Sequence, residues 1–344
     1  MQDNNLTAVP MNHSHMPRMI QKHMETKVPM FIWSPPGCGK TAIVEAICEQ
    51  FGWRLIDLRL AQMDTVDVRG IPFIFEGRTY YAAPGALPPE DGSWGPCIIF
   101  LDEYMQARQD VAAVSGQLVN ERRLGDYHLP DNVLIMAASN RAGDRAASGR
   151  MPTQIANRFL HYELVVRPTE WCDWATANGI DDRVVAFIRF RPELVYQFDP
   201  KATAPAYPTL RTWEKVSTMI KGEASSDVEY IRRVTYAAVG EGAGAEFVGF
   251  VTALENLPDI DAIIADPDAH DDPERPDLRF AVAAALGRRA DQGNVESIWS
   301  YLLKLPAEWQ VLWSKDVVSL GDFDLTQHPV YNEIISLHRD ILTA

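Results

Sequence analysis

The feature that most constrains the fold of this chain is a glycine-containing loop that lies between a short apolar run and a helical pattern. Val28 to Trp33 is apolar and has the length of a buried strand. The loop that follows reads Ser34-Pro35-Pro36-Gly37-Cys38-Gly39-Lys40-Thr41. Ile43, Ala46 and Ile47 then recur with helical spacing, and Gly52 is a suitable helix end. Strand, glycine loop and helix in this order are the context that a phosphate-binding loop requires.

Each part of this loop has an expected role in holding ATP. Gly37 and Gly39 allow backbone N–H groups to turn toward phosphate oxygens, and the helix N-terminus adds partial positive charge. Lys40 would reach the β- and γ-phosphates, and the Thr41 hydroxyl would bind Mg²⁺. Ser34 stands where the first glycine of the usual pattern is expected, and a small residue should be tolerated there. A chance glycine turn is the alternative, which the flanking strand and helix disfavour.

Polar side chains follow two further strand-like runs. Cys97 to Leu101 is continuously apolar, as expected of a strand buried in a parallel sheet, and it ends in Asp102 and Glu103. Asp102 would hold the Mg²⁺ shell, and Glu103 would polarise the attacking water. Val133 to Ala138 is a third strand, and Asn140 behind it could orient that water or touch the γ-phosphate. A solvated acidic turn and a turn-forming asparagine are the structural alternatives.

Together these motifs make the chain similar to the AAA+ ATPases, and within them to the MoxR-like group. The resemblance covers about residues 20 to 215 and rests on Pro36 to Thr41, Asp102-Glu103, Asn140, Asn157-Arg158-Phe159 and Thr209-Leu210-Arg211-Thr212-Trp213. The family usually has proline at the position of Leu210. The resemblance implies an α/β fold, a P-loop NTPase with a parallel sheet core, followed by an α-helical lid and a helical C-terminal extension.

The same resemblance assigns roles to two arginines. It implies that Arg158 is the arginine finger supplied to a neighbouring subunit and that Arg211 senses nucleotide from the lid. A planar guanidinium suits the charge on a transferring phosphoryl group, and such a finger is worth about 10³ to 10⁵ in rate. A helix-capping role is the alternative for Arg158. Nearby arginines compete for the role in the neighbouring site: Arg141, Arg145 and Arg150. A finger acting on a neighbour requires an oligomer, and the resemblance implies a hexameric ring.

Two hairpins are expected within the nucleotide-binding part. The aromatic, β-prone runs of residues 71–81 flank Glu76-Gly77, and residues 122–129 form a second short pattern. They resemble the helix-2 insert and the pre-sensor hairpin of the MoxR branch, which face the central pore or a bound partner. Ribbons that merely cover the sheet edge are the alternative. Catalysis by Asp67, which precedes the first hairpin, is not expected.

The domain organisation follows from these motifs and from the helical patterns beyond Pro168. We expect a flexible leader over 1–19, the AAA+ α/β nucleotide-binding domain over 20–166, a helical lid over 167–255, and an acidic linker with a helical extension over 256–344. Seven aspartates among prolines predict that Leu257 to Asp277 is a solvated linker. Val295, Ile298, Trp299 and Leu302 predict an amphipathic helix.

Composition narrows the remaining possibilities. The 344 residues carry a net charge of −15, which disfavours a general nucleic-acid binder. No apolar run approaches the roughly 20 residues that span a bilayer, and the polar N-terminus lacks a signal-peptide core. A cytoplasmic protein without a membrane segment is therefore expected. Four cysteines without CxxC spacing make disulfides and zinc unexpected, and Cys38 is expected to pack rather than to react.

These observations predict a Mg-dependent ATPase, and the resemblance implies that it works as a homo-oligomeric ring. By resemblance its work is to remodel or activate a protein client, and a partner with a von Willebrand factor A domain is the first to seek. Two alternatives stay open at this level. One is a nucleic-acid motor subunit, in which Arg78, Arg122 and Arg123 would make the pore locally basic. The other is a scaffold that binds ATP to assemble and rarely hydrolyses it.

Overall fold

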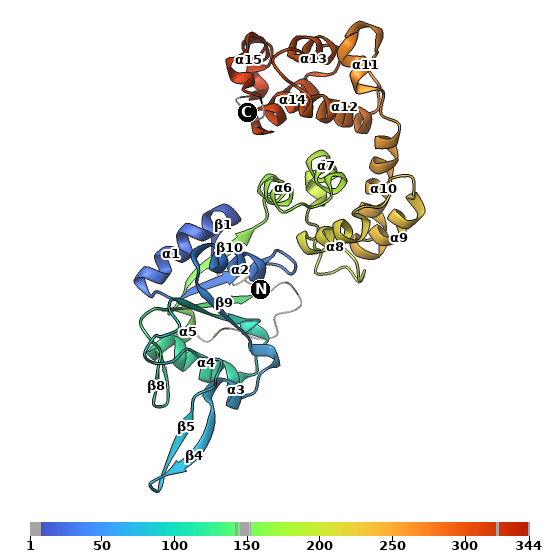
Figure 1. Ribbon diagram of the computed structural model, residues 1–344. Helices are drawn as coiled ribbons and strands as arrows, with labels where there is room; N and C mark the ends of the chain where they lie inside the picture. The colour runs from blue at the N-terminus through green and yellow to red at the C-terminus, as the bar shows by residue number, and fades with distance from the viewer. Residues whose placement is uncertain (1–7, 142–143, 145–150, 152, 321–322, 343–344) are drawn as a thin grey trace. The chain divides into compact units, whose positions relative to one another are not determined.

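The computed structural model describes residues 8–141, 144, 151, 153–320 and 323–342 of the chain (Figure 1). The chain divides into two units. The first, here called the α/β unit, comprises Met1–Trp171, Tyr196–Ala204 and Thr209–Thr212. The second, the helical unit, comprises Cys172–Val195, Pro205–Pro208 and Trp213–Ala344. In the described part of the chain, no helix has both the length and the apolar character needed to cross a membrane.

A parallel sheet forms the centre of the α/β unit, as the sequence predicts. Its strands are β1 (Val9–Asn12), β2 (Met30–Trp33), β3 (Arg54–Arg59), β6 (Cys97–Asp102), β9 (Val133–Ser139) and β10 (Leu160–Val165). They lie in the order β1-β10-β2-β9-β6-β3, and every pairing is parallel. The strand ends that carry the candidate site residues therefore share one edge of the sheet.

Helices cover both faces of this sheet, which explains why its central strands are apolar on both sides. The helices of the unit are α1 (Met16–Thr26), α2 (Lys40–Phe51), α3 (Thr65–Arg69), α4 (Gln109–Glu121) and α5 (Thr153–Ala156), with short turns η1 (His13–His15), η2 (Leu60–Gln62) and η3 (Tyr104–Gln106). Phe31 belongs to one buried cluster, with Leu118 of α4. Ile32 belongs to the other, with Ile20 of α1 and Ile47 of α2.

The expectation of a flexible leader over residues 1–19 needs correction for its described part. β1 pairs with β10 from Val9↔Tyr162 to Asn12↔Val165, and α1 already begins at Met16. Met11 is 4% exposed and Met16 is fully buried, so the segment contributes to the core. Pro10 and Pro17 fit these elements, because proline is tolerated on an edge strand and in the first turn of a helix.

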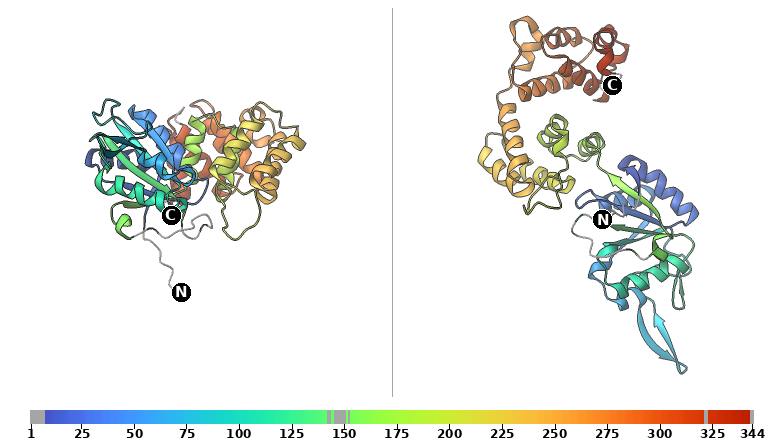
Figure 2. Two further views of the ribbon diagram at one scale, coloured as in Figure 1. Left: turned by 90° about the horizontal axis from the view of Figure 1, so that it is seen from below. Right: turned by 180° about the vertical axis from the view of Figure 1, so that it is seen from behind.

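Both predicted hairpins are confirmed, and each forms a two-stranded sheet of its own. The first consists of β4 (Ile71–Phe75) and β5 (Arg78–Ala82), and it extends from the α/β unit (Figures 1 and 2). Glu76 and Gly77 both have positive φ, as a two-residue hairpin turn of the primed type requires. The second consists of β7 (Arg123–Leu124) and β8 (Tyr127–His128).

The helical unit confirms the helical character expected after Pro168. Its elements are α7 (Asp182–Phe190), η4 (Pro192–Leu194), α9 (Val228–Val239), α10 (Glu241–Glu255), α11 (Ile260–Ala265), η5 (Pro267–Ala269), α12 (Pro276–Arg288), α13 (Val295–Leu302), α14 (Ala307–Leu320), η6 (Leu325–Gln327) and α15 (Pro329–Leu342). α6 (Pro168–Ala177) and α8 (Leu210–Ile220) each begin in the α/β unit and end in the helical unit. The expected boundary between a lid ending at 255 and an extension beginning at 256 stays a prediction.

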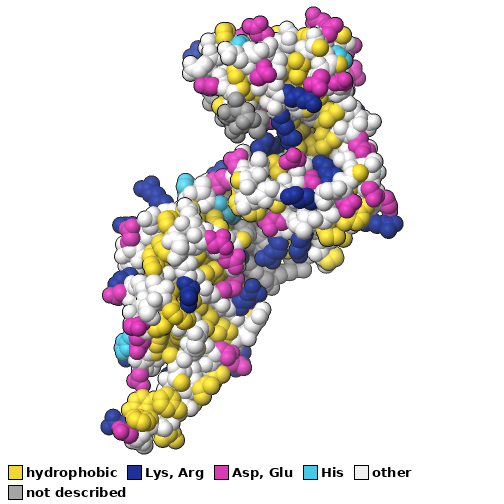
Figure 3. Space-filling view, in the orientation of Figure 1, with side chains coloured by type: hydrophobic (Ala, Val, Ile, Leu, Met, Phe, Trp, Pro, Cys, Tyr) yellow, Lys and Arg dark blue, Asp and Glu magenta, His cyan; other side chains and the backbone are white. Residues whose placement is uncertain are grey.

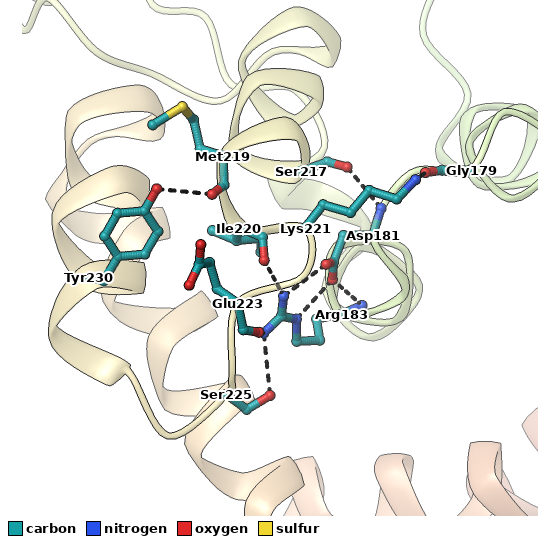
Figure 4. A network of polar contacts seen from close by, with 10 residues as sticks. All are labelled: Gly179, Asp181, Arg183, Ser217, Met219, Ile220, Lys221, Glu223, Ser225 and Tyr230. Carbon is teal, nitrogen blue, oxygen red and sulfur yellow. Dashed lines mark hydrogen bonds and ion pairs between the residues drawn. The ribbon is translucent and has the colours of Figure 1, made fainter.

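An arginine joins the start of α7 to the end of α8 (Figure 4). Arg183 donates to Asp181 Oδ2 at 2.8 Å and to the carbonyl oxygen of Ile220 at 2.7 Å. It also donates to the carbonyl oxygen of Glu223 at 3.1 Å. A partly buried guanidinium in this position satisfies the last carbonyls of the helix and complements its dipole. These bonds fix the C-terminal end of α8 within the helical unit.

The acidic stretch from Leu257 to Asp277 contains more structure than the solvated linker that we expect from the sequence. Asp259 caps α11 by accepting the N–H groups of Asp261 and Ala262, and Asp266 accepts the N–H of Ala269 in η5. Asp272 binds Arg279 of α12 through two hydrogen bonds of 2.7 and 2.5 Å. Several of the aspartates therefore start helices or form ion pairs, which is a usual role for this residue type.

Candidate functional site

Lys40, the first residue of α2, lies between the ends of two neighbouring strands. Its ammonium group donates to Ser34 Oγ at 2.9 Å and to Asn140 Oδ1 at 3.0 Å. Ser34 follows β2 and Asn140 follows β9, and these strands pair side by side. Burial lowers the pKa of Lys40, and the nearby Asp102 carboxylate acts in the opposite direction. The structure therefore brings Asn140 into contact with Lys40, which lies 100 positions earlier in the sequence.

The second group of predicted residues lies one strand further along. Thr41 Oγ1 donates to Asp102 Oδ2 at 3.2 Å, and Asp102 ends β6, the neighbour of β9. Glu103 follows with φ of 55°, a left-handed conformation that is uncommon for a residue with a side chain. Its N–H donates to Asp102 Oδ1 at 2.8 Å. Strained backbone of this kind is concentrated at functional sites, so the conformation of Glu103 supports its candidacy.

The glycines of the loop are needed for two different reasons. Gly37 and Gly39 have φ of 79° and 78°, the left-handed region that glycine adopts without cost. At Gly37 there is also no room, because a Cβ atom would lie 2.8 Å from Cβ of Thr209. At Gly39 nothing lies within 4 Å of the position that a Cβ would take, so only the backbone angle requires glycine there. Left-handed glycines in such a turn allow successive N–H groups to converge on an anion.

Cys38 is a packing residue of this loop, as expected. Its side chain is 1% exposed, and burial raises the pKa of its thiol above the ordinary value. Interactions with Tyr196 and with the charge of Lys40 lower that pKa by smaller amounts. The thiolate is the reactive form, and burial disfavours it.

The candidate arginines occupy different surroundings. Arg211 is exposed in the first turn of α8, and its charge contributes to lowering the pKa of Lys40. Arg158 is exposed on the turn between α5 and β10. Arg141 forms an ion pair with Glu163 at 2.6 Å. Arg145 and Arg150 lie outside the described residues. The catalytic roles of these arginines stay predictions.

Three residues near the loop escape sequence reasoning. Asp144 is 8% exposed, and burial raises the pKa of its carboxyl group, while Arg141 and Lys40 lower it. Tyr196 donates its hydroxyl to the carbonyl oxygen of Pro36 at 2.6 Å. His13 bonds through Nε2 to the carbonyl oxygen of Cys38 at 3.0 Å. None of them belongs to a local motif, so only the tertiary structure places them beside the loop.

Comparison with protein families identifies the part of the chain that carries this site. Residues 30–159 match the family described as ATPase family associated with various cellular activities (AAA). They form an AAA domain. The match begins at the first residue of β2 and ends beside β10, so the AAA domain includes Lys40, Asp102 and Asn140.

Curated relatives align with this chain over limited lengths. Midasin of Giardia intestinalis is 27% identical over 172 residues, which are 47% of this chain and 4% of midasin. The large subunit of replication factor C from Ignicoccus hospitalis is 36% identical over 89 residues, covering 25% of this chain and 17% of that protein. CbbQ of Hydrogenophilus thermoluteolus is 32% identical over 101 residues, which are 28% of this chain and 36% of CbbQ. The chain thus spans only a minor part of each of these relatives.

Solved structures align more loosely. NtrX from Brucella abortus in complex with ADP gives a TM-score of 0.39 at 15% identity, covering 71% of this chain and 67% of that one. A RuvB mutant from Thermotoga maritima gives a TM-score of 0.39 at 13% identity, and the alignment covers 84% of this chain and 86% of RuvB. These TM-scores are too low to support an inference about function, so the function rests on the AAA domain and on its site.

Proposed function

We propose that the AAA domain binds ATP with Mg²⁺ and hydrolyses it to ADP and phosphate. The observation that carries this proposal is the meeting of Lys40, Asn140, Thr41 and Asp102 at one edge of the parallel sheet. A cation, an amide, a hydroxyl and a carboxylate placed around a glycine loop are the groups that phosphoryl transfer requires. The residues that would hold the nucleotide are Ser34, Pro35, Pro36, Gly37, Cys38, Gly39, Lys40, Thr41 and Asp102.

The donor set suits magnesium. Thr41 Oγ1 and Asp102 Oδ2 are hard oxygen ligands that already lie 3.2 Å apart. The described residues contain no group of three or more His, Cys, Asp or Glu arranged for a metal. Mg²⁺ needs no such group, because it is usually held by one or two protein oxygens together with phosphate oxygens and water. When bound, the ion would neutralise charge on the β- and γ-phosphates.

Hydrolysis would then depend on two polar side chains at the strand ends. Glu103 would accept a proton from water while the water oxygen forms a bond to the γ-phosphorus. The bond between the γ-phosphorus and the β,γ-bridging oxygen breaks in the same step. Asn140, held by Lys40, orients the water or the γ-phosphate. ADP and inorganic phosphate are the products, and Glu103 then releases the proton to the phosphate or to solvent.

We further propose that the chain acts as a homo-oligomeric ring, with six subunits as the resemblance to AAA+ proteins implies. Arg158 would enter the site of the neighbouring subunit, and its exposed position on a turn is compatible with that reach. Arg211 would respond to nucleotide from the start of α8. The charge of Arg211 already influences the pKa of Lys40, which supports its place beside the phosphates.

The work coupled to hydrolysis would be the remodelling or activation of a protein client, as in MoxR-type proteins. The similarity to CbbQ supports this proposal, and so does the exposed apolar surface of the first hairpin (Figure 3). Ile74 is 80% exposed, Ile71 68% and Phe75 58%. Large apolar side chains gathered on one projecting element are typical of a contact surface. A partner with a von Willebrand factor A domain remains the first candidate.

A trapped complex tests both the chemistry and the client. The Glu103→Gln variant should bind ATP without turning it over and should retain its client in a pull-down with Mg²⁺ and ATP. Lys40→Ala serves as the matched control, because it should bind neither ATP nor, therefore, the client. Equal ATP binding by Lys40→Ala and the unaltered protein would contradict the proposed site. Strong stimulation of ATP hydrolysis by DNA at low salt would instead favour a nucleic-acid motor.

A further inference from the structure

Two backbone carbonyls of the phosphate loop are hydrogen-bonded by side chains that belong to no nucleotide-binding motif. Tyr196 donates its hydroxyl to the carbonyl oxygen of Pro36 at 2.6 Å. His13 Nε2 lies 3.0 Å from the carbonyl oxygen of Cys38. A carbonyl oxygen can only accept, so Nε2 of His13 must carry the hydrogen in this bond. All four residues belong to the α/β unit.

Each of these carbonyls shares a peptide plane with the N–H group of a glycine. In a trans peptide the C=O and the following N–H point in opposite directions. The chain has no cis peptide among its described residues. A donor that holds the Pro36 carbonyl outside the loop therefore turns the Gly37 N–H toward the inside. In the same way, the bond from His13 to Cys38 turns the Gly39 N–H inward.

Glycine makes this orientation adjustable, which is why an external restraint matters. Gly37 and Gly39 both have positive φ, but glycine also adopts negative φ at little cost. Either peptide plane could rotate and present its carbonyl to the phosphates, where oxygen would repel oxygen. Hydrogen bonds of 2.6 and 3.0 Å to the two carbonyls oppose that rotation. The packing of Thr209 against Gly37 restrains the same turn from another side.

We propose that Tyr196 and His13 are positioning residues that orient the Gly37 and Gly39 N–H groups of the phosphate loop toward the β-phosphate of the nucleotide. This inference rests on the proposed function. Its specific content is that two hydrogen bonds outside the loop set nucleotide affinity. The residues act through the peptide planes and not by touching the nucleotide.

Removal of one hydroxyl tests the first bond. Tyr196→Phe keeps the ring and its packing, so the variant should fold. Loss of one orienting hydrogen bond should raise the Kd for MgADP, measured by calorimetry on the full chain, by about five- to tenfold. The KM for ATP should rise in the same ratio, while kcat stays within about twofold, because phosphate contacts made equally in ground and transition states affect KM alone.

Tyr230→Phe is the matched control. The Tyr230 hydroxyl also donates to a backbone carbonyl, that of Met219 at 3.0 Å, but it lies in the helical unit (Figure 4). This variant should leave the Kd for MgADP unchanged. A merely structural hydroxyl at Tyr196 would lower the unfolding temperature in the absence of nucleotide without changing Kd, which is the result expected for Tyr230→Phe. That result for Tyr196→Phe would overturn the proposal.

The second bond is tested by a pair of substitutions at His13. His13→Ala removes the donor and should raise the Kd for MgADP, whereas His13→Gln offers an amide N–H at a similar reach and should retain more of the affinity. Equal Kd values for both variants and the unaltered protein would contradict the role of His13. If circular dichroism shows that Tyr196→Phe is unfolded, the His13 pair alone decides the proposal.

The unaltered protein and Lys40→Ala separate this inference from the proposed function. If the unaltered protein does not bind MgADP, or if Lys40→Ala binds it equally well, the proposed function itself is wrong. If the unaltered protein binds, Lys40→Ala does not, and neither Tyr196→Phe nor His13→Ala changes Kd by more than about twofold, only the positioning role is wrong.

Discussion

Ser34 changes the chemistry of the phosphate loop at the position where glycine is expected. The sequence predicts only that a small residue is tolerated there. In the structure Ser34 is fully buried, and its hydroxyl oxygen accepts a hydrogen bond from Lys40 at 2.9 Å. A buried ammonium group needs acceptors to offset the loss of water. Ser34 and Asn140 supply two of them, so the serine supports the lysine on which nucleotide binding depends.

Replacement of this hydroxyl should have a measurable cost. Ser34→Ala leaves the size of the side chain almost unchanged but removes an acceptor from a buried cation, so the free energy of unfolding should fall by about 1.5 to 3 kcal/mol. Urea unfolding measures the change. Ser115→Ala is the control, because Ser115 is equally buried but bonds to the neutral carbonyl of Val111, and it should cost about 1 kcal/mol. Equal costs would remove the special role of Ser34.

Asp57 of β3 gives a pH-dependent prediction. Burial raises the pKa of its carboxyl group above the ordinary 3.8; Asp102 acts in the same direction and Arg59 in the opposite one. In the described structure its Oδ1 atom is buried without a hydrogen-bond partner. Because the folded chain holds this proton more tightly than the unfolded chain, the contribution of Asp57 to stability is present below pH 3.8 and is lost as pH rises through the raised pKa.

The Asp57→Asn variant has no such proton. Its free energy of unfolding, relative to that of the unaltered protein, should therefore increase as pH rises from below 3.8 through the acidic range. Unfolding by urea at a series of pH values measures the difference. A difference that stays constant with pH, or one that decreases, would show that Asp57 is not held in its neutral form by burial.

At the scale of elements, β1 adds a strand to the sheet that local patterns do not reveal, and α1 follows it directly. If the N-terminal segment were a flexible leader, a substitution in it would hardly change the free energy of unfolding, whereas a substitution in a folded segment would lower it. Met16 is fully buried, so Met16→Ala should lower the free energy of unfolding by about 2 to 5 kcal/mol. Met219 is 52% exposed, and Met219→Ala should cause little change. Equal small effects in thermal unfolding would indicate that the N-terminal segment does not pack as described.

The contrast between β2 and β1 explains how much of the fold could be predicted. β2, β6 and β9 are continuous apolar runs that end in loop or acidic residues, so their positions follow from local sequence. The hairpin around Gly77 is also predictable from local sequence, because a two-residue turn that contains glycine separates two β-prone runs. β1 is only four residues long and half exposed, and its pairing partner lies about 150 residues away. No local pattern encodes that pairing.

The candidate site follows the same division. Lys40, Thr41, Asp102 and Asn140 end or begin predictable strands and helices, and the edge of a parallel sheet brings such residues together. Tyr196 lies 160 positions from the Pro36 carbonyl that it binds. A tyrosine and a histidine without motif neighbours resemble ordinary surface residues in the sequence. Contacts of this kind depend on the whole fold.

At the scale of the whole molecule, the proposed ring makes a prediction that no single chain can satisfy. Glu103→Gln subunits lack the base but keep Arg158, whereas Arg158→Ala subunits keep the base and lack the finger. Neither should hydrolyse ATP alone, because a finger is worth about 10³ to 10⁵ in rate. In mixed rings, some interfaces combine an intact Glu103 with an intact Arg158 from the neighbour, so part of the activity should return.

Measurement of ATP turnover against the mixing ratio checks this expectation. Mass spectrometry or native electrophoresis should first verify that the rings contain both variants. Absence of rescue in verified mixed rings would count against a finger acting on the neighbour. It would leave Arg141, which forms an ion pair with Glu163, among the remaining candidates.

The pairing of β1 with β10 has a consequence for how the protein is produced. Methionines occur at positions 11, 16 and 19, and translation from any of these internal codons would yield a chain without an intact β1. Such a product would expose the backbone of β10 as a new sheet edge, and unpaired edges recruit strands from other chains. Starts at Met16 or Met19 would also remove His13 and its bond to the phosphate loop. Shortened products of the gene should therefore aggregate with one another or with the full-length chain. An expression clone should retain every codon from Val9 onward.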